Sequence, residues 1–258
     1  MFYFYLKTGQ KKYFDQVETL LFNISSKGLY DHLVGGIARY TVDENWIIPH
    51  FEKMLYDNIQ YIGLLNKFYQ ETKNNYYKRK LKQTIHFINA EFKNKIDLYG
   101  SAFDADSDGV EGKYYIWSYI ELKKILRDDL KIFEKKYKIT ENGNFEENNI
   151  LTETGFKLSD EENKKIINLE NLLSNERSKR TKPLFDDKSQ TDQNCFLLET
   201  LLISSLIIED EELKQKTLNN INTLENYLSD NIFHCYQDTE IDAFLEDYVY
   251  YSSLLTTM

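Results

Sequence analysis

The clearest indication of the fold comes from residues 51–92, FEKMLYDNIQYIGLLNKFYQETKNNYYKRKLKQTIHFINAEF. Apolar side chains recur there every three or four residues, the spacing that places them on one face of an α-helix. One such run covers 51–72 and a second covers 76–92, with polar residues 73–75 between them. The stretch therefore predicts two helices joined by a short connection, and it indicates a protein built from paired helices.

The same periodicity extends outward in both directions. Further helices are expected at 2–8, 13–26, 118–126, 159–177, 193–208, 211–229 and 243–255. Ser118 with Glu121, and Ser159 with Glu162, match the capping box that begins a helix. Strands are expected only at 113–117 and 145–151. Helix pairs separated by long loops suit an α/α array, either a closed toroid of helical hairpins or an open solenoid.

The composition excludes several classes of protein. Twenty Tyr and 16 Phe among 258 residues are too many for a disordered chain. A formal net charge of −10 does not suit a nucleic-acid-binding surface. No apolar run approaches the roughly 18 residues of a membrane-spanning helix, so no membrane partner is expected. Cys195 and Cys235 form neither a disulfide framework nor a metal spacing, and we expect a reducing, cytoplasmic location and no metal.

Residues 28–58, GLYDHLVGGIARYTVDENWIIPHFEKMLYDN, contain two of the four histidines and one of the two tryptophans. His50 and Glu52 could form a proton-transferring pair at the mouth of a pocket, because histidine titrates near neutral pH and a carboxylate sets its tautomer. Tyr40 and Trp46 could stack on a sugar ring. Gly35 and Gly36 permit a turn with positive φ. The alternative is structural: a network of salt bridges and caps pins this long loop, and its members are Asp31, Arg39, Glu52 and Asp57.

A second motif is SAFDADSDGVEGKYYIW, residues 101–117. Asp104, Asp106, Asp108 and Gly109 match the opening of a calcium-binding loop, but Tyr115 stands where the bidentate Glu should be. The acids could instead face a substrate as general acid and base. The third interpretation is an Asp-Gly turn leading into a strand.

Two further motifs place acids beside apolar helices. In PLFDDKSQTD, residues 183–192, the Asp186-Asp187-Lys188 run could form a polar site, or residues 191–192 could simply cap the next helix. In AFLEDY, residues 243–248, Glu246 and Asp247 interrupt an apolar helix; one exposed face explains Glu246 better than Asp247. His234 adjoins Cys235, but two ligands do not make a zinc site.

Together these blocks resemble the spermatogenesis-associated protein 20 family, whose members are also called thioredoxin domain-containing proteins. The resemblance is carried, in the family's order, by residues 30–58, 102–117, 182–188 and 243–248, with PHFEKMLYDN at 49–58 the most specific part. It implies a thioredoxin-like domain followed by an α/α toroid of the six-hairpin glycosidase type, similar to sugar 2-epimerases and several glycoside hydrolases. Two positions depart from the family pattern: Ala38 replaces a usual His, and residues 189–195 lack a Trp-Asn pair.

The resemblance implies one all-α domain over residues 1–258, a partial (α/α)6 toroid with short β-hairpin insertions. It also implies that the chain is truncated at both ends, that the thioredoxin-like domain is absent, and that a neighbouring gene product could complete the toroid. The implied function is carbohydrate-active, either hydrolysis or epimerisation, by acid–base chemistry in a central acidic pocket that needs no cofactor. The alternatives are a non-catalytic binding or scaffold module, a decayed fragment without activity, or a calcium-bound module.

The expected ligand is a sugar or another small molecule. The catalytic residues would be His50, Glu52, Asp104 and Asp106. The substrate-binding residues would be Asp31, His32, Arg39, Tyr40, Trp46, Asp187, Lys188, Glu246 and Asp247.

Overall fold

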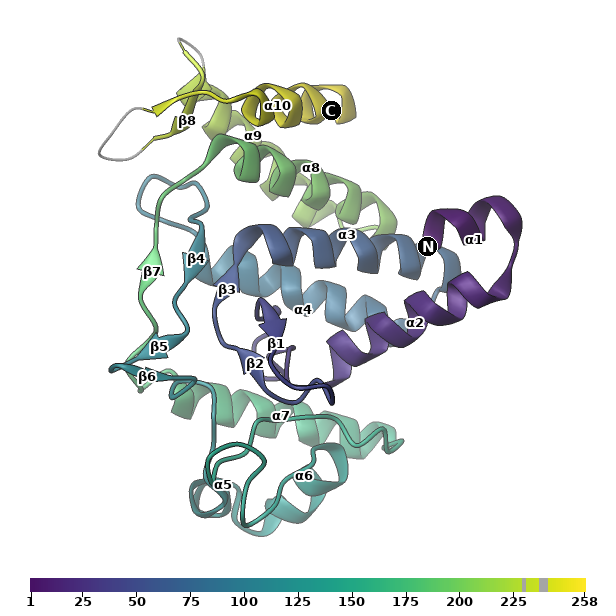
Figure 1. Cartoon of the computed structure of the whole chain (residues 1–258), viewed down its shortest axis with the longest axis vertical. Coiled ribbons are helices and arrows are strands. Elements are labelled where there is room, and N and C mark those ends of the chain that lie inside the picture. The colour runs from purple at the N-terminus through teal and green to yellow at the C-terminus, as the bar shows by residue number, and fades with distance from the viewer. Residues whose placement is uncertain (229–230, 237–240) are drawn as a thin grey trace. The chain divides into compact units, whose positions relative to one another are not determined.

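The computed structural model describes residues 1–228, 231–236 and 241–258 (Figure 1). It is mainly helical, and its strands are only two or three residues long, so the predicted helical class with short β insertions is confirmed. The toroidal arrangement of the helices stays a prediction. No helix in these ranges combines the length and hydropathy that a bilayer crossing requires.

The chain divides into two compact units. Unit 1 comprises Met1–Leu33, Ile37–Phe51 and Asp106–Lys182. Unit 2 comprises Val34–Gly36, Glu52–Ala105 and Pro183–Met258. The expectation of one domain over the whole chain stays a prediction, and each unit is described separately below.

Unit 1 holds helices at both ends of its sequence and two small hairpins. Its elements are α1 (Phe2–Thr8), α2 (Lys11–Ser26), β1 (Tyr40–Thr41), β2 (Pro49–His50), β5 (Asp106–Ser107), β6 (Val110–Glu111), α5 (Tyr119–Leu126), the 3-10 turn η1 (Arg127–Asp129), α6 (Leu130–Lys136) and α7 (Asp160–Arg177). The predicted caps are confirmed. Ser118 accepts a hydrogen bond from the Glu121 N–H, and Ser159 and Glu162 form a complete capping box at the start of α7.

The strand predicted at 113–117 is wrong, and the reason lies outside that segment. The guanidinium of Arg180 donates to the carbonyl oxygens of Tyr114 and Ile116, at 2.9 and 2.8 Å, and its carbon lies 4.0 Å from the centre of the Trp117 ring. The backbone therefore curls around a cation instead of extending. The predicted strand at 145–151 is likewise reduced to isolated bridges, one of which joins Trp117 to Asn149.

Unit 2 holds the predicted helical hairpin. Its elements are β3 (Lys53–Met54), α3 (Leu55–Thr72), α4 (Asn75–Glu91), β4 (Ala102–Phe103), β7 (Phe185–Asp186), α8 (Thr191–Ile208), α9 (Glu211–Leu228), β8 (Phe233–Cys235), β9 (Ile241–Asp242) and α10 (Leu245–Thr257). Figure 1 shows α3 and α4 side by side, as their periodicity predicted. Ser229, the predicted last residue of one helix, lies outside the described residues.

Helix α8 is the centre of unit 2. It packs against α3, α9 and α10 and buries residues on most of its faces, which matches its largely apolar sequence. A three-stranded sheet in the order β3-β4-β7 leads into it. An isolated bridge between Gln190 and Cys235 then brings β8 to the start of α8. The first turn of α8 therefore lies where the sheet, β8 and α10 meet.

The glycine pair predicted to need positive φ is confirmed, with φ of 94° at Gly35 and 80° at Gly36. A Cβ atom on Gly36 would lie 2.4 Å from the Phe87 ring. Only glycine therefore satisfies both the backbone conformation and the close packing at this position.

Candidate functional site

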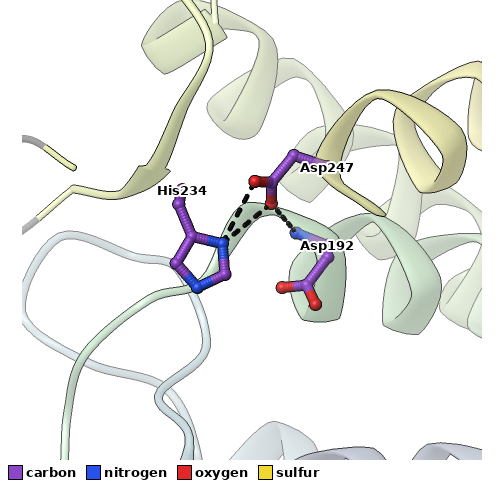
Figure 2. Close-up of side chains that lie close together, drawn as sticks. All are labelled: Asp192, His234 and Asp247. Carbon is purple, nitrogen blue, oxygen red and sulfur yellow. Dashed lines mark hydrogen bonds and ion pairs between the residues drawn. The ribbon is translucent and has the colours of Figure 1, made fainter. Parts of the chain in front are cut away.

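Three ionisable side chains of unit 2 come together around the first turn of α8 (Figure 2). Asp192 comes from α8, His234 from β8 and Asp247 from α10. Each offers a ligand atom, and these atoms all lie within 4.8 Å of one another. The three residues are distant in sequence, so the cluster exists only because the tertiary fold joins three elements.

Asp247 is the fixed point of this cluster. Its side chain is fully buried, and its two oxygens accept the backbone N–H groups of Asp192 at 3.0 Å and of Phe244 at 2.8 Å. One carboxylate thus serves the N-termini of both α8 and α10, where backbone donors lack partners within the helix. This explains why an acid interrupts the apolar segment 243–248.

His234 is held from both sides of its ring. Nδ1 lies 3.1 and 3.2 Å from the two Asp247 oxygens, and because a carboxylate only accepts, this nitrogen carries a proton. Nε2 lies 2.9 Å from the side-chain nitrogen of Gln190, from which it accepts. The ring also packs on Phe244 with a centroid distance of 4.8 Å. The imidazole therefore has a defined orientation between a carboxylate and an amide.

The cluster has an excess of negative charge. Burial raises the pKa of Asp192, and the negative charge of Asp247 raises it further. The Gln193 N–H and His234 lower this pKa, but the net shift is upward. Burial together with the same two carboxylates raises the pKa of the nearby Cys195 thiol to about 12. Within the described residues, no Lys or Arg forms an ion pair with Asp192 or Asp247.

A second cluster lies in unit 1 and contains part of the predicted catalytic set. His50 Nδ1 lies 2.8 Å from a Glu111 oxygen, and the His50 ring stacks on Tyr40 with a centroid distance of 5.0 Å. Asp106 lies directly opposite Glu111 in the β5–β6 hairpin. Opposite residues of an antiparallel pair project from the same face, so the Asp106 carboxylate lies on the same face of the hairpin as Glu111. The side chains of His50 and Glu111 are 29% and 49% exposed and so are open to a ligand.

The predicted Asp-Gly turn is confirmed at this hairpin. Ser107 pairs with Val110, and Asp108 and Gly109 between them both have positive φ, as a two-residue hairpin turn of type I′ requires. The Asp108 carboxylate pairs with Lys113 at 2.9 Å, and hydrogen bonds from Lys113 and then Thr181 lower its pKa. A lysine therefore balances the charge of this acid.

Asp31 and His32 make buried structural contacts in unit 1. Asp31 forms a two-pronged ion pair with Arg177, with distances of 3.0 and 2.9 Å. The His32 ring lies between Tyr30 and Tyr137, with Nε2 at 3.0 Å from the Lys27 carbonyl oxygen and Nδ1 at 3.6 Å from Glu153. These contacts fit the interpretation that charged residues pin the long loop.

The other predicted site residues are divided between the two units. In unit 1, Arg39 is exposed, and Trp46 lines a surface pocket of about 390 Å³ together with residues of α2. In unit 2, Glu52 and Asp187 are half-buried, whereas Asp104, Lys188 and Glu246 are exposed. Lys188 pairs with the adjacent acid Asp186 at 3.4 Å. The predicted convergence of all these residues on one acidic pocket stays a prediction.

Three residues of the two clusters were absent from the sequence-based candidate set. Glu111 follows a turn whose geometry, once recognised, pairs it with Asp106. Asp192 was considered only as a helix cap, and His234 only beside Cys235. The one available signal was Asp247, a carboxylate in an apolar segment that needs a buried partner.

Comparisons with known proteins agree with the family resemblance of the sequence. The structure defines a mainly helical protein with short β insertions. No protein-family model matches the sequence. Over 243 residues the chain is 25% identical to human and 26% identical to rat spermatogenesis-associated protein 20, covering 80% of this chain and 31% of each relative. The mouse protein of that name is 30% identical over 137 residues, 47% of this chain and 17% of the relative. The chain is thus similar in sequence to spermatogenesis-associated protein 20 and spans about a third of the length of the human and rat proteins.

Proposed function

We propose that the chain carries out acid–base chemistry on a carbohydrate, at the face of unit 1 formed by Tyr40, His50, Asp106 and Glu111. The observation that carries the proposal is the 2.8 Å contact between His50 and Glu111 beside a stacked tyrosine. The sugar class follows from the resemblance to six-hairpin glycosidases and sugar epimerases. A toroidal helix arrangement and a cytoplasmic location belong to the same proposal.

Each group has a chemical role in this proposal. Glu111 holds Nδ1 of His50 as a donor, so a proton exchanged with a ligand would be carried by Nε2. Asp106 supplies a second carboxylate on the same face, as sugar hydrolysis requires, whereas His50 could itself be the base for proton removal beside a carbonyl. The half-exposed ring of Tyr40 offers an apolar edge to a sugar. The catalytic roles expected for Glu52 and Asp104, which belong to unit 2, stay predictions.

The test is a panel of glycosides and free sugars, assayed for reducing-end release and for epimerisation by NMR. His50→Ala and Glu111→Gln should each lower the rate by about 10²–10⁴-fold, the usual contribution of a positioned acid or base. His86→Ala is the matched control, because His86 is an exposed histidine on α4 of unit 2. Equal rates for the wild type and His50→Ala would remove this cluster from the chemistry.

A second candidate function is a non-catalytic binding or scaffold module. It is favoured by the buried pair of Asp31 and Arg177, because a residue expected to contact substrate instead joins a loop to a helix. The two functions differ in calorimetry with sugars at millimolar concentration. Heat without turnover would indicate binding only, and neither heat nor turnover would indicate a scaffold.

A further inference from the structure

We propose that Asp192, His234 and Asp247 bind a divalent transition-metal ion, and that zinc is the ion their donor set fits best. This site lies wholly in unit 2 and does not depend on the acid–base cluster of unit 1. The set combines one imidazole nitrogen with two carboxylates from three different elements. Three protein ligands with a remaining position for water are typical of catalytic zinc sites.

The spacing of the donors is suited to one ion. Bonds of about 2.1 Å to zinc place tetrahedral ligands about 3.4 Å apart, and the observed ligand atoms all lie within 4.8 Å of one another. Figure 2 shows the His234 ring and the Asp192 carboxylate on the same side of Asp247. Asp192 is half-buried, so a small side-chain rotation can close the set without moving a backbone element.

Binding would change the tautomer of His234. Nδ1 of His234 now donates to Asp247, and zinc would take this nitrogen while the proton moves to Nε2, so the imidazole stays neutral and no proton is released. Asp247 could keep the N–H bonds from Asp192 and Phe244, because a carboxylate has about four acceptor positions. Zinc would therefore replace the hydrogen bond between His234 Nδ1 and Asp247, and both helix caps would stay in place.

The surroundings provide the support that metal ligands require. A metal-bound histidine usually donates its other ring N–H to a nearby oxygen, and the Gln190 amide already lies 2.9 Å from Nε2 of His234. Rotation of that amide by a half turn would present its oxygen to the ring and its NH2 group to Gln193. Among the described residues, the buried amide oxygen of Gln193 has no hydrogen-bond partner, and a half turn of the Gln193 amide would let this oxygen accept from Gln190.

Charge and donor type select the class of ion. Two carboxylates beside one neutral imidazole would leave a partly buried excess of negative charge, and a divalent ion neutralises it. Calcium and magnesium prefer all-oxygen sites, whereas an imidazole ligand suits zinc and its transition-metal neighbours. The nitrogen of His234 therefore distinguishes this site from an ordinary group of surface acids.

The experiment is a calorimetric titration of the metal-free full chain with zinc, repeated with cobalt to read the visible absorption of the bound ion. Asp192→Asn and His234→Gln should each weaken zinc binding more than 10-fold and abolish the cobalt spectrum. Gln190→Ala, which acts through His234, should weaken binding by about 10-fold. Circular dichroism of each variant would establish that the fold is kept. Asp247 is left unchanged because it caps two helices.

Two controls make the assignment specific. His86→Ala removes an exposed histidine elsewhere in unit 2, and Cys235→Ser removes the thiol next to His234; both should bind zinc as the wild type does. Wild-type chain that binds no zinc, or Asp192→Asn and His234→Gln variants that bind it unchanged, would overturn the proposal. Loss of binding in Cys235→Ser would replace the proposed donor set with a thiolate site.

Discussion

The ion pair between Asp31 and Arg177 makes the sharpest stability prediction. Their side chains are only 5% and 3% exposed, the contacts are 2.9 and 3.0 Å, and the guanidinium also lies 5.1 Å from the centre of the Tyr114 ring. Burial disfavours the charged guanidinium, but Asp31 more than offsets this and keeps the pKa of Arg177 above its usual value. Arg177→Met would therefore remove the cation that forms both of these contacts with the buried Asp31 carboxylate.

Loss of one partner from a buried pair costs about 3–5 kcal/mol. At about 2–4 °C per kcal/mol for a chain of this size, Arg177→Met should lower Tm by about 6–20 °C. Asp31→Asn should destabilise the protein by a similar amount, because it removes the negative charge that contacts the buried Arg177 guanidinium. The double variant Asp31→Asn/Arg177→Met removes both charges, so it should be less destabilised than the sum of the single variants.

The assay is urea unfolding followed by helical circular dichroism for the four proteins of this cycle. Lys179→Met is the matched control, because Lys179 pairs with Glu176 at 2.7 Å on the surface just beyond α7 and should contribute less than about 1 kcal/mol. Two results would contradict this prediction: a loss of unfolding free energy in Arg177→Met no larger than that in Lys179→Met, or a loss in the double variant equal to the sum of the losses in the two single variants. Either result would show that the pair does not anchor the loop to α7.

Four further predictions test single features of the fold. Ser159→Ala should cost about 1 kcal/mol in urea unfolding, since it removes the cap of α7; an unchanged midpoint would contradict the cap. Lys135 and then the Ser159 N–H lower the pKa of Glu162, so its stabilisation is present above the unfolded value of about 4.3 and is lost as pH falls through the folded value. Glu162→Gln should accordingly flatten the acid side of the stability profile. Gly36→Ala should cost at least about 1 kcal/mol from its positive φ alone, and a Tm equal to wild type would show that the turn relaxes. With a pKa of about 12, Cys195 should resist alkylation at pH 8 until the chain is unfolded by urea; rapid labelling of the folded protein would refute its burial.

Helices could be predicted from the sequence because their signals are local. Residues 159–177 carry both a capping box and an apolar stripe, and α7 begins and ends within one residue of the expected bounds. Helix α6 was missed because it continues directly from a 3-10 turn, and no capping side chain marks its first residue. The strand expected at 113–117 failed because the deciding interaction comes from Arg180, far along the chain.

The candidate sites were predictable only in part, for the same reason. Asp247 could be singled out, because a carboxylate among apolar residues needs a buried partner. Its partners could not be identified, since Asp192 and His234 lie on separate elements and no spacing rule connects them. In unit 1, His50 and Asp106 could be predicted as candidates, but Glu111 could not. Glu111 lies opposite Asp106 and contacts His50 only because of the register of the β5–β6 hairpin.

The shared cap at Asp247 has a consequence for synthesis of the protein on the ribosome. The Asp192 N–H finds its acceptor 55 residues further along the chain. During synthesis this N–H can therefore bond only to water until the start of α10 has left the ribosome. The N-terminal cap of α8 is completed only after residue 247 has been added, although the rest of the helix was made long before.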